Sequence, residues 1–111
     1  MKFTRNIEMA LEKWLRPEWW NTPPTHPHDA CRFYDFVEVV WRESRTIDEA
    51  RIIREARRLF PNRFQKGSDT SDLREKLSQT KEMLNCLEYL ENKGVLINLT
   101  TGLRQMIIRS V

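Results

Sequence analysis

The sequence has little of what marks membrane spans or secretion. In its 111 residues no apolar run approaches the roughly 20 residues needed to cross a bilayer. The first residues, MKFTRNIEMALEKW, are too charged for the apolar core of a secretory signal, and Glu8 and Glu12 argue against a transit peptide. We therefore expect one cytoplasmic domain over residues 1–111, with no membrane partner.

Glycine and histidine are also scarce, which disfavours common catalytic sites. The chain has three glycines, no two of them close together, so it has no glycine-rich phosphate loop. Its two histidines, His26 and His28, both lie in a proline-rich loop, so only that loop could supply a nucleophile–histidine pair. The sequence therefore predicts a protein that is not an enzyme, with no cofactor and no small-molecule substrate.

Metal-binding and disulfide chemistry have few candidate residues. The stretch HPHDAC holds His26, His28, Asp29 and Cys31, but their spacing is not that of a metal site, and Asp29 is better placed to cap a helix. Cys31 and Cys86 lie among apolar neighbours, which favours reduced thiols in the core; a disulfide between them stays open. We expect no metal.

The balance of residue types is that of a globular protein. Hydrophobic residues make up 40% and charged residues 32% of the chain, and the formal net charge is +3. Neither half of the chain is a polybasic tail. This mild excess of positive charge permits contact with nucleic acid without requiring it.

Two helices are predicted in the N-terminal part. Apolar residues recur at helical spacing over residues 3–16, and again over residues 29–43. Between them, residues 17–28 contain four prolines, which excludes regular structure there. Residues 1–45 are therefore expected to form a helical extension with a proline-rich loop.

The remainder of the chain predicts three helices and a hairpin. Thr46 and Glu49 have the spacing of a capping box and open a helix over residues 47–60. Gly94 suits the end of a later helix, because glycine readily adopts the left-handed conformation that closes one. After residue 60 we expect a short helix over residues 72–78, a break at residues 78–80 and a longer helix over residues 81–93. Two strands, at residues 95–99 and 103–111, form the expected hairpin.

This order, carried by TSDLREKLSQTKEMLNCLEYLENKGVLINLTTGLRQMIIRSV, resembles the winged helix-turn-helix family over residues 46–111. The resemblance implies a mainly α fold: three helices and a C-terminal β-hairpin, here with two extra N-terminal helices. Residues 95–108 match the wing. The family's packing positions match Leu73, Met83, Leu87, Leu90 and Gly94.

The resemblance also implies a set of DNA contacts. In DNA-binding members the third helix enters the major groove and the wing touches the backbone. The matching positions on the third helix are Gln79, Thr80, Lys81 and Asn85, and those in the wing are Arg104 and Arg109. The glutamates Glu82, Glu88 and Glu91 on the same helix work against phosphate contact, and they favour a protein partner instead.

A separate basic stripe is predicted on the helix over residues 47–60. Arg51, Arg54 and Arg58 recur at helical spacing, and arginines in such a row can hold phosphates. The alternative is a solvated face whose charge is balanced by neighbouring acids, namely Asp48, Glu49 and Glu55.

Aromatic residues are dense in the N-terminal part. They either form a core between the two N-terminal helices or present an exposed patch to a partner protein, because Trp and Tyr dominate interface anchors. The predicted partner-binding residues are Trp19, Trp20 and Phe36.

Two functions follow from these patterns. The first is a non-enzymatic DNA-binding winged-helix protein, in replication, transcription regulation, or a mobile-element or defence complex. The alternative is a protein-interaction module, a small helical subunit of a larger nucleoprotein assembly, whose partner is another protein or a second copy of the chain.

Overall fold

The computed structural model describes residues 1–16, 27–64 and 68–94, and within them the chain forms four helices and no strand. The expected winged helix-turn-helix fold is therefore wrong, because the described residues form helices without a strand. The two helices expected at residues 72–78 and 81–93 form one continuous helix. The expected wing, residues 95–108, lies outside the described residues. The helices are α1 (Arg5–Leu15), α3 (Pro27–Glu43), α4 (Glu49–Leu59) and α5 (Ser68–Asn92).

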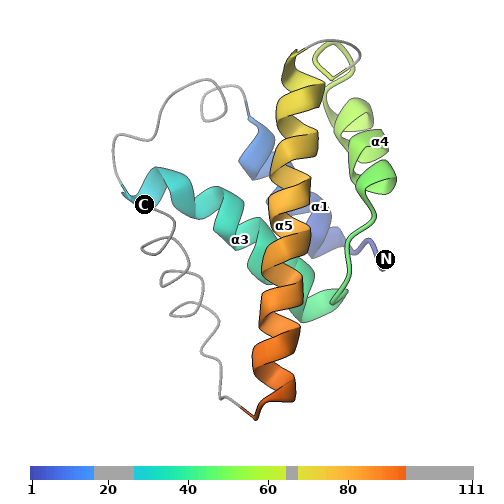
Figure 1. The fold of residues 1–111 in the computed structure, drawn as a ribbon. Coiled ribbons are helices and arrows are strands. Elements are labelled where there is room, and N and C mark those ends of the chain that lie inside the picture. Colours follow the sequence, from blue (N-terminus) through green and yellow to red (C-terminus); the bar gives the residue numbers. More distant parts are fainter. Residues whose placement is uncertain (17–26, 65–67, 95–111) are drawn as a thin grey trace.

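The helices α3 and α4 each pack on α5, the longest helix, and α1 packs on α3 and α4. Figure 1 shows α5 running the length of the molecule, with α4 beside its N-terminal half and α3 crossing behind it. Contacts join α1 to α3 and α4, and join α5 to α3 and α4. One hydrophobic core receives side chains from all four helices, because each helix turns an apolar stripe inward. Its buried members are Ile7, Leu11, Trp14, Leu15, Phe33, Phe36, Val37, Val40, Trp41, Ile52, Ile53, Ala56, Phe64, Leu73, Leu77, Leu84 and Leu87.

The two N-terminal helices are confirmed, with altered ends. α1 begins at Arg5, where the Thr4 hydroxyl accepts a hydrogen bond from the backbone N–H of Ile7 at 3.2 Å. α3 begins at Pro27, since proline needs no N–H partner in the first turn of a helix. The expectation that Asp29 caps this helix is therefore wrong, because Asp29 lies inside it.

The cap of α4 differs from the predicted capping box. The Asp48 carboxylate accepts hydrogen bonds from the N–H groups of Ala50 and Arg51, at 3.1 Å and 3.4 Å. Asp48 directly precedes the first helical residue, whereas Thr46 comes two residues earlier and is exposed. A capping side chain must adjoin the first turn to reach its free N–H groups, so Asp48 and not Thr46 caps the helix.

The predicted break at residues 78–80 is absent, and α5 is continuous from Ser68 to Asn92. Thr80 is fully buried, and its hydroxyl donates to the backbone carbonyl of Lys76 at 2.9 Å. That bond satisfies the hydroxyl inside the helix, so Thr80 does not compete with the helical backbone. Thr80 joins the inward row of Leu73, Leu77, Leu84 and Leu87, spaced by four and three residues in turn.

The end of α5 is as predicted. Gly94 follows the helix with a φ of 74°, and its N–H donates to the carbonyl of Glu91 at 3.0 Å. Glycine adopts this left-handed conformation without the steric cost that a Cβ imposes.

The loop after α4 ties the helices together. The Arg63 guanidinium donates to the last carbonyl of α1, that of Leu15. The Phe64 carbonyl accepts from Arg57 Nε at 2.6 Å and from the Thr70 hydroxyl at 3.2 Å. These bonds fix α1, the end of α4 and the start of α5 to one segment. Separately, the described helices include none that is both long and apolar enough to cross a membrane.

Candidate interaction surfaces

The predicted DNA contacts on α5 do not form a recognition surface. Thr80 is 0% exposed, which contradicts its predicted role in contacting DNA. Gln79 is partly buried, whereas Lys81 and Asn85 are exposed. Lys81 Nζ lies 4.0 Å from a Glu49 carboxylate oxygen, which ties it to α4. These residues lie in the middle of a helix, so they offer no free N–H groups to a phosphate.

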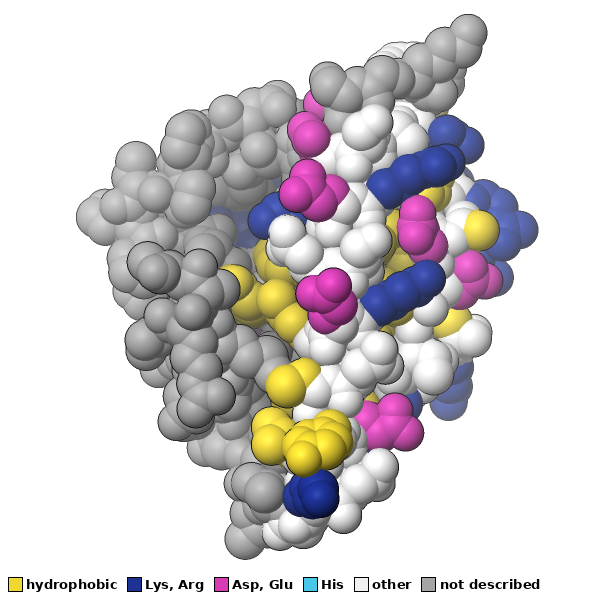
Figure 2. All heavy atoms as spheres, in the orientation of Figure 1, with side chains coloured by type: hydrophobic (Ala, Val, Ile, Leu, Met, Phe, Trp, Pro, Cys, Tyr) yellow, Lys and Arg dark blue, Asp and Glu magenta, His cyan; other side chains and the backbone are white. Residues whose placement is uncertain are grey.

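The exposed side of α5 is acidic. The helix contains six acidic and three basic residues. Figure 2 shows carboxylates and cations interspersed over the face that α4 and α5 form, rather than a continuous basic surface. A helix with a negative balance repels the phosphate backbone.

The arginine stripe on α4 is largely paired within the protein. Arg58 lies 2.8 Å from Glu55 and 2.6 Å from Glu8, and Arg51 lies 3.2 Å from Glu55. The hydrogen bond to Glu55 raises the pKa of Arg58, and the charges of Glu55 and Glu8 act in the same direction, against a lowering by burial. Arg54 is exposed and has no ion pair among the described residues. The alternative of a balanced face thus describes most of the stripe.

The two other arginines near the stripe support the fold. Arg57 holds the Phe64 carbonyl, and Arg63 holds the end of α1. Burial lowers the pKa of Arg63, and the charge of Asp69, 3.6 Å away, opposes that shift. Arginine stays protonated at neutral pH, so this guanidinium is a partly buried cation that binds the chain's own carbonyl and carboxylate.

Phe36 is a core residue, so the prediction that it anchors a partner is wrong. It is 0% exposed and stacks on Trp14, with ring centroids 5.1 Å apart and an interplanar angle of 25°. Phe33 packs on the same indole at 5.0 Å. Since α1 covers this side of α3, the aromatic side chains fill the interior between them. Trp19 and Trp20 lie outside the described residues, as do Arg104 and Arg109.

One cysteine also differs from expectation. Cys86 is exposed with a free thiol, and is not in the core. It lies on the C-terminal half of α5 near Tyr89, whose exposure is 60%. Figure 2 shows hydrophobic side chains gathered near that end of α5. Met83 and Leu90 are partly buried on the same half of the helix.

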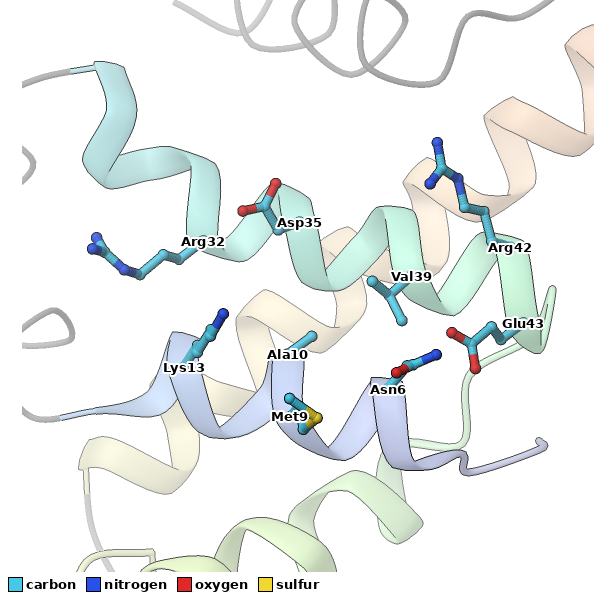
Figure 3. A pocket seen from close by; sticks show the side chains of 9 residues that line it. All are labelled: Asn6, Met9, Ala10, Lys13, Arg32, Asp35, Val39, Arg42 and Glu43. Atoms are coloured by element: carbon cyan, nitrogen blue, oxygen red, sulfur yellow. The ribbon is translucent and has the colours of Figure 1, made fainter.

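A groove between α1 and α3 forms a half-open hollow of about 380 Å³. Figure 3 shows the side chains that line it. Met9 and the small side chain of Ala10 come from α1, and Val39 from α3, so the middle of the groove is apolar. Charged and polar side chains surround that middle: Asn6, Lys13, Arg32, Asp35, Arg42 and Glu43.

The groove is polarised along its length. Figure 3 shows Lys13 and Arg32 at one end, and Asn6 and Glu43 at the other, because α1 and α3 run antiparallel. Arg42 lies beyond the middle on the Glu43 side, where it pairs with Glu38 at 2.7 Å. Sequence reasoning missed these residues, since the groove exists only once residues far apart in the chain pack together. The small Ala10 on an otherwise large-residue helix face was the available signal.

The described residues contain no group of three or more His, Cys, Asp or Glu side chains placed to hold a metal ion. Comparison with known proteins finds no matching family model, no similar curated protein and no similar solved structure.

Proposed function

We propose that the chain is a non-enzymatic protein-interaction module, a small helical subunit of a larger assembly, and that it binds its partner through the groove between α1 and α3. A single observation carries the proposal. The groove combines an apolar middle with charges of both signs at its edges. Protein interfaces have this arrangement, with an apolar centre and a polar rim.

The charges of the groove favour a protein over a nucleic acid. Asp35 and Glu43 are two carboxylates that a phosphate backbone would meet at close range. A protein partner can place a cation against each carboxylate and an anion against Lys13, so both signs contribute to specificity. We infer a cytoplasmic location as well, because the free exposed thiol of Cys86 stays reduced there.

Photo-crosslinking in cells tests this proposal. A photoreactive residue in place of Met9, which is 44% exposed beside the groove, should form a covalent adduct with a protein. The matched control replaces Ser71, which is exposed at the start of α5 and does not line the groove. Equal adducts from both positions, or adducts with nucleic acid alone, would contradict the proposal.

One observation favours the second candidate, a nucleic-acid-binding protein. α4 contains four arginines and two glutamates, and Arg54 is exposed with no ion pair among the described residues. Such a surface could contact phosphates, although only weakly. Titration with duplex DNA at low salt tests it, because phosphate binding must weaken as salt rises.

A further inference from the structure

Two unpaired charges of opposite sign mark the two ends of the groove. Lys13 is exposed near the C-terminus of α1, and Glu43 is partly exposed at the C-terminus of α3. Neither has an ion-pair partner among the described residues, in contrast to Glu8, Glu38 and Glu55. The structure pairs many of its other surface charges, whereas Lys13 and Glu43, together with Asp35, line a shared hollow (Figure 3).

This polarity makes the groove complementary to itself. A twofold axis that crosses the groove near Ala10 would lay one copy over another with the ends reversed. Lys13 of one copy then faces Glu43 of the second copy, and the same pair occurs again on the other side of the axis. The axis also sets Asp35 against the Arg42 side of the second copy, which is again a pair of opposite signs.

The apolar middle supplies the contact that such an interface needs at its centre. Met9 stands 44% exposed beside Ala10, and both line the groove with Val39. Methionine is flexible and fills irregular gaps. Across the axis, Met9 of each copy can enter the space that the small Ala10 leaves in the other, which buries apolar surface at the centre and leaves the charges at the rim.

We propose that the groove between α1 and α3 binds a second copy of this chain, antiparallel and around a twofold axis at Ala10. This inference rests on the proposed function, since it names the partner of the same groove. Charge complementarity selects the occupant. A second copy carries a cation and an anion at the spacing the groove requires, whereas a polyanion would meet Asp35 and Glu43.

Charge reversal at both ends gives a test that only a second copy can satisfy. Lys13→Glu places a glutamate against Glu43 of the second copy, and Glu43→Lys places two lysines together. Each variant alone should therefore dissociate at least about tenfold more readily than the wild type, because the axis repeats each repulsion. A mixture of the two variants restores opposite signs at both contacts, because one chain then carries glutamates at positions 13 and 43 and the other carries lysines there. The mixture should therefore form heterodimers more tightly than either variant pairs with itself.

Sedimentation equilibrium over a range of concentrations measures these affinities. Arg54→Glu, on α4 and outside the groove, is the matched control and should dimerise as the wild type does. Met9→Glu removes the apolar centre without reversing either end, and it should also weaken the dimer about tenfold. Circular dichroism verifies that each variant keeps its helices, and Met9→Glu serves if one charge variant does not fold.

The outcomes separate this inference from the function on which it rests. A wild-type chain that stays monomeric, single variants that dimerise normally, or a mixture that fails to recover would each overturn the homodimer. If the photoreactive residue at position 9 then captures a different protein, the groove is still a protein-binding site. If it captures no protein at all, the proposed function fails as well.

Discussion

Arg58 Nη2 on α4 lies 2.6 Å from Glu8 Oε2 on α1, which joins two helices across 50 residues of sequence. Glu55 holds the same guanidinium from the other side at 2.8 Å and also pairs with Arg51 at 3.2 Å. Two carboxylates thus engage two of the three arginines in the predicted stripe, and the stripe holds α4 against α1 as much as it faces solvent.

Removing these two carboxylates should expose the stripe. We expect the double variant Glu8→Gln/Glu55→Gln to bind duplex DNA about tenfold more tightly than the wild type at low salt, because it frees arginines that the protein now neutralises. Fluorescence anisotropy at increasing salt measures the change. Glu82→Gln/Glu88→Gln on α5 alters the net charge equally without freeing these arginines, and an equal gain there would contradict the role of the stripe.

The cap of α4 should depend on Asp48 and not on Thr46. Asp48→Ala should destabilise the protein by about 1 kcal/mol, because two N–H groups in the first turn lose their acceptor. Thr46→Ala should have little effect, since Thr46 is exposed and precedes the cap. Urea denaturation followed by circular dichroism compares them. A larger loss of stability from Thr46→Ala than from Asp48→Ala would show that Thr46 caps the helix, as the predicted capping box requires.

Thr80 distinguishes one continuous helix from two. Thr80→Val should be nearly neutral, since the Lys76 carbonyl can keep its helical N–H partner when the hydroxyl is lost. Thr80→Pro should cost about 3 kcal/mol or more, because proline removes a helical hydrogen bond and clashes with the carbonyl four residues earlier. Thermal unfolding gives both values. A well-tolerated proline would indicate a break in α5 at this position.

Phe36 should behave as a core residue. Phe36→Ala should destabilise the protein by about 3–5 kcal/mol, because it leaves a cavity against Trp14 in a fully buried site. Tyr89→Ala, at a side chain that is 60% exposed, is the matched aromatic control and should change stability little. Denaturant unfolding measures both. Equal small losses would show that Phe36 is not packed in the interior.

Local sequence pattern predicted the helices better than their ends and their roles. The spacing of Ile7, Leu11 and Trp14 identified the buried face of α1, and Gly94 identified the end of α5. These predictions succeeded because periodicity and glycine conformation are properties of a few neighbouring residues. The groove that holds Lys13 and Glu43 could not be predicted in this way, because it forms from two helices that are separated in the sequence.

Sequence pattern alone predicted a mainly helical chain and the end of α5 at Gly94, because apolar spacing and glycine conformation act locally. It misplaced the cap of α4 and predicted a break inside α5 that is absent. Which residues are accessible to a partner depends on how the helices pack together. Thr80 is buried, and its hydroxyl donates to the Lys76 carbonyl within α5. Phe36 is buried against Trp14, so neither side chain can contact a partner. Antiparallel packing of α1 on α3 created the groove, since Ala10 and Val39 meet only when the helices fold together.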